Sequence, residues 1–384
     1  MATAHSAGKK FRVVIAGGGI AALEAAAALH ALAADRTEVT LISPEDSFHL
    51  PYAELLEPFA GGAPTEYPTA RLAEDLNFEH HADRYRWVNP GDRVVHTTAG
   101  VSIEYDALLL ASGARRRPRF HNAVTLTTAH MAEQVTALLA DVDAGRVRSV
   151  ALIVPSQPSW PLPLYELALM LSTHAVEHGV ELAIHLVTPE DAPLAVLGHN
   201  ASRDISYLLR SYGISVHAAQ HCQVHEPGIV WMHPSGSVLR PDAVIALPEL
   251  FGSAIPGIPT SAVRGFISVD PHGAVRGLSN VFAAGDATNV PIKHGSIAAA
   301  QADAAAGAIA ALAGAPVEPK PARLVTHAVL LGARSPIYVR AQVSGDHGSI
   351  SEVSLTPLWD TGAKLHARYL SPYLQQLDAA RATV

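Results

Sequence analysis

A glycine-rich turn near the N-terminus constrains the fold more than any other feature. Residues 11–16 (FRVVIA) are apolar and rich in β-branched side chains, and they run into Gly17-Gly18-Gly19 and an alanine-rich segment that ends near Ala34. This order predicts a strand, a tight turn and a helix. Residues 38–43 (EVTLIS) predict a second strand, so the segment has the length of one βαβ unit.

The turn has the spacing G-x-G-x-x-A, which is typical of dinucleotide-binding βαβ units. Gly17 permits the tight turn, Gly19 lets a pyrophosphate approach the backbone, and Ala22 allows close packing of helix on strand. The phosphates would lie on the amides where the helix begins, at Ile20 and Ala21. The alternative is a glycine-rich turn with a structural role.

An acidic residue is expected after the second strand, where it would bind ribose hydroxyls. Glu45 follows that strand and is the candidate, with Asp46 as the second choice. The alternative is a solvated loop carboxylate.

Two later segments extend this pattern and carry a family resemblance. YDALLLASGA (105–114) and VFAAGDAT (281–288) stand in the order expected for a nucleotide-binding domain that is interrupted by another domain. The chain resembles the FAD-dependent pyridine nucleotide–disulfide oxidoreductase superfamily, on the branch of sulfide:quinone reductase and type II NADH dehydrogenase. The resemblance implies an α/β fold with two Rossmann-like domains of the glutathione-reductase type, a small C-terminal α+β segment and non-covalently bound FAD.

The domain boundaries follow from this order of motifs. We expect a discontinuous FAD-binding domain of residues 1–118 and 256–318, a second Rossmann-like domain of residues 119–255, and a C-terminal segment of residues 319–384.

The resemblance also implies which residues contact FAD. Asp286 takes the position that contacts the ribityl–phosphate region, and the helix that starts near Ser296 would point its N-terminus at the flavin. Lys293, one of five lysines, fits a cation near the flavin O2, with a solvent-facing loop lysine as the alternative. The remaining implied contacts are Ser112, Gly113 and Gly285.

The second domain lacks the glycines that a nicotinamide dinucleotide needs. Family members that oxidise NAD(P)H carry a second strand–GxGxxG–helix, but here the apolar strand 149–155 leads into a proline-rich turn without glycine and a helix from 163 to 178. Prolines remove amide donors, and side chains block the approach of a pyrophosphate. A normal nicotinamide dinucleotide site is therefore not expected.

The same turn should face the flavin ring. Trp160, Tyr165 and Glu166 are the candidate catalytic side chains, and Glu166 takes a position that lies near the flavin in the resembling families. An apolar setting would raise the pKa of such a carboxylate and suit it to proton transfer. The alternatives are two core aromatics and an acid at a helix N-terminus.

Cysteine content and charge exclude some functions. Cys222 is the one cysteine, so the redox cysteine pair of sulfide:quinone and disulfide reductases has no counterpart, and Ser156 and Ser159 stand in the relevant turn. A single thiol and the lack of a signal peptide favour a cytoplasmic location. The formal charge of −8 argues against a nucleic-acid partner.

No metal site is predicted. His217, His221 and His225 would align on a helix, but their segment indicates a hairpin, and they are interpreted as surface histidines, as are His80 and His81.

The C-terminal tail is expected to contain a helix. A helix at 364–378 has an apolar face that favours packing on its own body or on a second subunit, with contact to a membrane as the alternative. Residues 115–118 are expected to be a basic loop and residues 266–270 a strand. No run of low charge is expected to be long enough to span a bilayer.

The sequence therefore predicts a flavoenzyme that moves two electrons through flavin N5 from a donor that is not a dinucleotide to a quinone or a small organic acceptor. An NAD(P)H:quinone reductase and a catalytically silent flavin-binding scaffold stay open, as does a homodimer.

Overall fold

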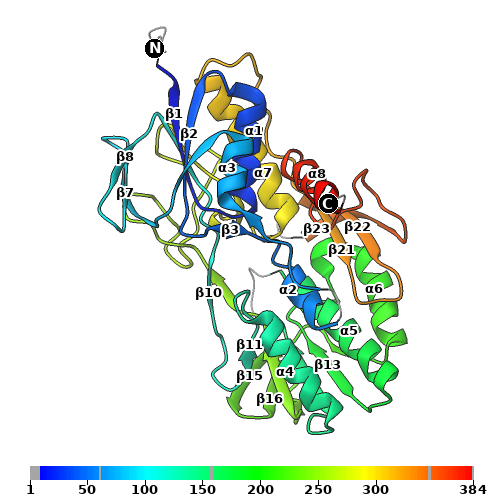
Figure 1. The fold of residues 1–384 in the computed structure, drawn as a ribbon. Helices are drawn as coiled ribbons and strands as arrows, with labels where there is room; N and C mark the ends of the chain where they lie inside the picture. Colours follow the sequence, from blue (N-terminus) through cyan, green and yellow to red (C-terminus); the bar gives the residue numbers. More distant parts are fainter. Residues whose placement is uncertain (1–8, 60–61, 156–159, 345–346, 383–384) are drawn as a thin grey trace.

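The computed structural model describes residues 9–59, 62–155, 160–344 and 347–382. Two α/β lobes stand one above the other, and the C-terminal elements lie beside both (Figure 1). This arrangement confirms the predicted α/β class with two Rossmann-like domains.

The first lobe is built on a five-stranded parallel sheet in the order β20-β9-β1-β2-β5. Its strands are β1 (Phe11–Ala16), β2 (Thr37–Ile42), β5 (Phe78–His81), β9 (Ala107–Leu110) and β20 (Val281–Ala283). Strands β9 and β20 pair with each other, although 170 residues lie between them in the sequence. The second lobe, which lies between them along the chain, is therefore an insertion into this sheet.

Alternate residues of β1 explain the layers. Val13 and Ile15 pack with helices α1 (Ile20–Ala33) and α7 (Gly295–Leu312) on one face of the sheet. Val14 and Ala16 pack on the other face with a small antiparallel sheet. That small sheet consists of β6 (Tyr85–Asn89), β7 (Val94–Thr97) and β8 (Ser102–Glu104).

Short elements connect the strands of the first lobe. They are β3 (Ser47–Phe48), α2 (Ala53–Leu56), the 3-10 turn η1 (Glu57–Phe59), β4 (Tyr67–Pro68), α3 (Thr69–Leu76) and the 3-10 turn η3 (Gly285–Ala287). α2 and η1 pack on helix α4 (Met131–Asp143) of the second lobe, so this excursion from the first lobe joins the two lobes.

The second lobe repeats the same plan. Its parallel sheet has the order β11-β18-β12-β13-β14, with helices on one face and an antiparallel sheet on the other. The strands are β11 (Val124–Thr125), β12 (Ser149–Ile153), β13 (Ala183–Val187), β14 (Ser215–His217) and β18 (Ala243–Ala246). The helices are α4 (Met131–Asp143), α5 (Leu162–His178), η2 (Ala195–Leu197) and α6 (His199–Ser211), and the antiparallel strands are β15 (His221–Glu226), β16 (Ile229–His233) and β17 (Val238–Leu239).

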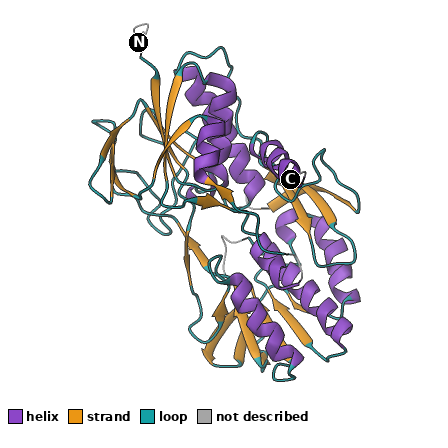
Figure 2. Ribbon diagram, in the orientation of Figure 1, coloured by secondary structure: helices purple, strands orange, loops and turns teal. Residues whose placement is uncertain are grey.

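Figure 2 shows a strand pair between the lobes, and here one prediction was wrong. The expected basic loop after residue 114 is a strand, β10 (Arg115–Arg117), which pairs with β19 (Glu249–Phe251). The guanidinium carbon of Arg117 lies 4.9 Å from the centre of the Phe251 ring, so the pairing of β10 with β19 gives the Arg117 side chain an aromatic partner. The predicted strand at 266–270 was also wrong, because this segment forms only isolated bridges.

The C-terminal segment bridges both lobes. Strands β21 (Val325–Leu330), β22 (Ile337–Ser344) and β23 (His347–Ser354) pack on the core of the second lobe, and helix α8 (Leu370–Ala382) packs on the core of the first. The predicted helix start at 364 was wrong, since α8 begins at Leu370 and Pro372 then lies in its first turn. Leu370 and Leu374 are buried, so the apolar side of α8 covers the protein's own body.

Within the described residues, one helix is long and apolar enough to cross a membrane, contrary to the sequence expectation. This helix is α7, and 61% of its 18-residue window is buried within the structure. Because α7 packs on α1 against the sheet, it has the setting of a core helix.

Glu24 of α1 fastens α8 to the first lobe. Its carboxylate is fully buried and accepts hydrogen bonds from the amides of Tyr369 (2.9 Å) and Leu370 (2.6 Å). Asp303 of α7 lies beside it, and burial followed by the charge of Glu24 raises the pKa of Asp303 to about 8. The two acids therefore share a proton at neutral pH.

This pair predicts a pH dependence of stability. The pKa of Asp303 is higher in the folded protein than in the unfolded chain. Asp303 therefore contributes fully to the free energy of unfolding below about pH 4, and this contribution is lost as the pH rises to about 8. The free energy of unfolding of the Asp303→Asn variant should not fall in this way, and the difference from the wild type should be about 1.4 kcal/mol for each unit of pKa difference. Urea unfolding of the wild type and the variant at pH 5 and pH 8 measures this difference. An equal fall in the free energy of unfolding for both would contradict the assignment.

Candidate functional site

The turn after β1 has the geometry that its glycines predict. Gly17 has φ +137°, and a Cβ there would lie 2.2 Å from the carbonyl oxygen of Ala111, so no other residue fits without a shift of the backbone. Ala22 is fully buried against the sheet. Gly19 precedes α1, and a Cβ there would meet no atom within 4 Å. Space for a ligand is therefore open where the pyrophosphate was predicted.

Glu45 lies at this turn. A Cβ at Gly18 would be 2.8 Å from Ser43 Cβ and 3.6 Å from Glu45 Oε2, which places the carboxylate beside the glycines. The Glu45 side chain is 57% exposed, and Arg84 Nη2 is 4.0 Å from its Oε1. Its position after β2 is that of the predicted ribose-binding acid.

Four more predicted contacts follow the ends of β9 and β20. Ser112 Oγ is buried without a hydrogen bond of standard geometry among the described residues, and Gly113 has φ +67° with open space at its Cβ position. A Cβ at Gly285 would lie 3.1 Å from that of Ala21, so this glycine lets η3 approach α1. Asp286 follows in η3, and burial raises the pKa of its carboxyl.

Lys293 is neither a solvent-facing lysine nor a free cation. It is 5% exposed, and its ammonium donates to the carbonyl oxygens of Asp286 (3.1 Å) and Thr288 (2.5 Å) while lying 4.0 Å from the centre of the Phe266 ring. Burial lowers the pKa of Lys293 to about 8. Lys293 therefore fixes the segment that carries Asp286.

The N-terminus of α7 lies against the second lobe. α7 begins at Gly295, and His294 precedes it as the capping residue, with Nδ1 accepting from the Ser296 amide at 3.3 Å. The Ser296 hydroxyl is 2.7 Å from His294 Nδ1 and accepts from the His327 amide at 3.1 Å, so it ties the helix start to β21. Trp160 packs on His294 with ring centres 4.5 Å apart.

Glu166 is buried at the same junction, in an ion pair. Its side chain is 2% exposed, and Oε1 accepts hydrogen bonds from the Leu331 amide at 2.8 Å and from the Lys364 ammonium. Lys364 also lies 5.2 Å from the centre of the Tyr52 ring. The buried setting of Glu166 therefore also contains a cation, Lys364, which comes from the C-terminal segment.

Burial and the Lys364 charge lower the pKa of His294 to about 3, so its imidazole is neutral at pH 7. The neutral ring carries its proton on Nε2, since Nδ1 accepts a hydrogen bond.

Tyr165 points away from this junction, contrary to the predicted grouping with Trp160 and Glu166. It is fully buried, and its hydroxyl donates to Glu190 Oε2 (3.2 Å) and accepts from the Leu194 amide (3.2 Å). Glu190 also accepts from Thr188 Oγ1 at 3.0 Å and from the Val196 amide at 3.4 Å. Burial raises the pKa of both Tyr165 and Glu190.

The predicted serines of the proline-rich turn, Ser156 and Ser159, lie outside the described residues. Sequence reasoning missed Glu190, His294 and Lys364. Glu190 had a readable signal, because LISPE at 41–45 and LVTPE at 186–190 follow equivalent strands of the two lobes. No sequence signal pointed to Lys364, because it contacts Glu166 across 198 residues of the chain.

The three histidines that only a helix would align, His217, His221 and His225, lie on two different strands. His217 ends β14 and its Nε2 lies 3.2 Å from His185 Nδ1, whereas His221 and His225 lie on strand β15. Cys222 lies on the same strand, where burial raises the pKa of its thiol to about 12. This thiol is therefore not a reactive thiolate.

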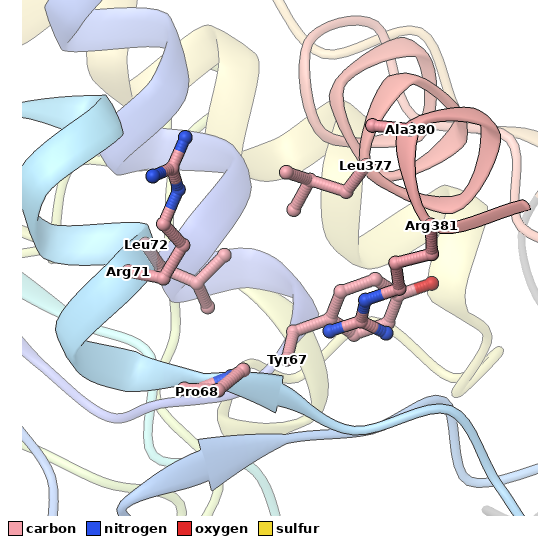
Figure 3. A pocket seen from close by; sticks show the side chains of 7 residues that line it. All are labelled: Tyr67, Pro68, Arg71, Leu72, Leu377, Ala380 and Arg381. Atoms are coloured by element: carbon pink, nitrogen blue, oxygen red, sulfur yellow. The ribbon is translucent and has the colours of Figure 1, made fainter. Parts of the chain in front are cut away.

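A separate cavity of about 470 Å³ lies between β4, α3 and α8, and Figure 3 shows its lining. Arg71 and Arg381 flank Tyr67 there, but Arg71 pairs with Asp75 at 2.8 Å and Arg381 donates to the Glu66 carbonyl at 2.7 Å. None of the lining residues is a predicted site residue, so we do not assign the substrate to this cavity.

The comparisons with known proteins agree with this geometry. Residues 11–150 match the family model described as pyridine nucleotide-disulphide oxidoreductase. Sulfide-quinone reductase of Aquifex aeolicus (strain VF5) is 27% identical over 193 residues. The match covers 49% of this chain and 44% of that protein, less than half of its length.

Solved structures share the fold over most of the chain. The sulfide:quinone oxidoreductase of Aquifex aeolicus superposes with a TM-score of 0.80 at 20% identity, covering 90% of this chain and 87% of that one. A ferredoxin reductase of Rhodopseudomonas palustris superposes with a TM-score of 0.65 at 20% identity, covering 87% and 83%. Together with the glycine turn, these matches show that residues 11–150 are similar to the pyridine nucleotide-disulphide oxidoreductase family and that the fold of the chain resembles that of a sulfide:quinone oxidoreductase.

Proposed function

We propose that this protein transfers two electrons through flavin N5 from a donor that is not a nicotinamide dinucleotide to a quinone or a small organic acceptor. The observation that carries this proposal is the interior position of Glu190. A nicotinamide dinucleotide would need an acid after β13 to bind its ribose, at the position that corresponds to Glu45 after β2 in the first lobe. Glu190 is 9% exposed and already holds hydrogen bonds from Tyr165 and Thr188.

The first lobe suits FAD. The turn at Gly17 and Gly19 with the α1 amides would hold the pyrophosphate, Glu45 the ribose, and Asp286 the ribityl region. Lys293 would act as a positioning residue that fixes the backbone beside Asp286. Bound FAD supplies the two-electron chemistry at its flavin ring.

The junction of α7, α5 and the C-terminal segment is the proposed place of proton transfer. Reduction of a quinone to a hydroquinone consumes two electrons and two protons, so a proton donor must stand near the acceptor. Lys364 Nζ holds a proton, and Glu166 Oε1 fixes its position in a buried ion pair. Trp160 and His294 provide an aromatic surface beside it for a planar acceptor.

Reoxidation of the enzyme tests this proposal. Enzyme whose flavin has been photoreduced anaerobically should recover its oxidised absorption when one equivalent of a soluble quinone is added. Lys364→Met should slow this recovery by about tenfold or more, because proton transfer typically contributes a factor of this size or larger. The exposed Lys320→Met serves as the control and should match the wild type. Absence of recovery with quinone in the wild type would contradict the proposed acceptor.

A further inference from the structure

Asp143, His174 and His178 form a cluster outside the proposed active site. The ligand atoms that these three side chains offer all lie within 4.8 Å of one another. His174 and His178 are one helical turn apart on α5 and so share a face, and Asp143 is the last residue of α4. We propose that this cluster binds one divalent transition-metal ion of the zinc class.

The distances suit an inserted ion. His174 Nε2 and Asp143 Oδ1 are 2.7 Å apart in a hydrogen bond. Zinc bonds of about 2.0–2.2 Å in a tetrahedral arrangement hold neighbouring ligand atoms about 3.4 Å apart. To bind an ion, His174 Nε2 and Asp143 Oδ1 must therefore move apart by less than about 1 Å, and a rotation of the two side chains is enough for this. The carboxylate and two imidazoles leave a fourth position for water.

The second histidine is already oriented as metal ligands usually are. His178 Nδ1 lies 2.9 Å from the His174 carbonyl oxygen, so Nδ1 donates and Nε2 is the nitrogen left for an ion. A hydrogen bond from the other ring nitrogen to a backbone carbonyl is the common support for a ligating histidine. The two rings stack with centres 3.9 Å apart, so the two side chains lie together on this face of α5.

The backbone also favours a cation at this point. α4 ends at Asp143 and α5 ends at His178, so the carboxyl ends of two helices converge on the cluster. Each helix end carries a partial negative charge, and the carboxylate of Asp143, 44% exposed, adds a full one. This combination distinguishes the cluster from a surface pair of histidines.

The site lies where the first lobe contacts the second. Phe59 of η1 makes an edge contact with His174, with ring centres 6.3 Å apart, and α2 packs on α4. An ion that joins α4 to α5 would therefore stabilise the surface on which α2 and η1 of the first lobe pack. The role is structural, and it does not depend on the electron donor or acceptor.

Zinc titration of the FAD-loaded full chain, free of any affinity tag and previously treated with EDTA, tests the proposal. We expect one Zn²⁺ per chain by competition with a chromophoric chelator, and a rise in the midpoint of thermal unfolding. His178→Ala and Asp143→Asn should each weaken binding by about tenfold or more. Both positions are exposed, so these variants should fold.

His130→Ala is the matched control, since His130 is an exposed histidine at the start of α4 that lies 3.5 Å from Glu133. It should bind Zn²⁺ like the wild type. Two results would overturn the proposal: wild-type protein that binds no stoichiometric Zn²⁺, or stoichiometric binding that His178→Ala and Asp143→Asn leave unchanged.

Discussion

Replacing Lys364 by Met should destabilise the protein by about 3–5 kcal/mol, the usual cost of removing one partner from a buried ion pair. Glu166 is 2% exposed and would keep only the Leu331 amide as a hydrogen-bond donor in the described structure. An uncompensated carboxylate would then be buried between α5 and the C-terminal segment. Denaturant unfolding of the FAD-loaded protein measures the loss.

A double variant separates the charge from the packing. Glu166→Gln combined with Lys364→Met removes both charges and keeps a side chain that can accept from Leu331, so it should recover most of the lost free energy of unfolding. Lys320→Met is exposed and should change stability by less than about 0.5 kcal/mol. A double variant as unstable as Lys364→Met alone would show that Lys364 acts by packing.

Two glycines of the first turn should fail in different ways when replaced by alanine. Gly17→Ala places a methyl group 2.2 Å from the Ala111 carbonyl oxygen at φ +137°, so it should destabilise the apoprotein and abolish FAD binding. Gly19→Ala meets no protein atom within 4 Å and should leave the apoprotein as stable as the wild type. It should still weaken FAD binding by about tenfold or more, because the methyl group occupies the space for the pyrophosphate.

Urea unfolding of the apoproteins and FAD titrations measure the two effects separately. Gly307→Ala is the control, since Gly307 lies within α7 with open space at its Cβ position and should be neutral or slightly stabilising. Normal FAD binding by Gly19→Ala would contradict the assignment of the turn to the pyrophosphate.

The local patterns of the sequence predicted the first lobe well. The strand–turn–helix at 11–34 fixes β1, Gly17 and α1 because each depends on neighbours in the chain: apolar runs, glycine spacing and helix formers. The resemblance, carried by the segments at 105–114 and 281–288, predicted that one sheet is interrupted by a second domain, as β9 and β20 show.

The candidate site was harder to predict because its contacts are long-range. Glu166 meets Lys364, and Glu24 meets the amides at 369–370, so both buried acids find hydrogen-bond donors in the C-terminal segment. The sequence also did not predict the direction of Tyr165. Neighbouring residues of a helix point to different faces, and Tyr165 points to the face where its hydroxyl bonds to the buried Glu190.

The absorption spectrum of the purified protein, recorded anaerobically before and after NADH or NADPH is added, tests the central claim most directly. We predict flavin bands that stay unbleached over minutes with either nucleotide, because Glu190, the acid proposed to be needed for a dinucleotide ribose, already accepts a hydrogen bond from Tyr165. Rapid bleaching by NADH or NADPH would contradict the claim and make the protein an NAD(P)H-dependent reductase.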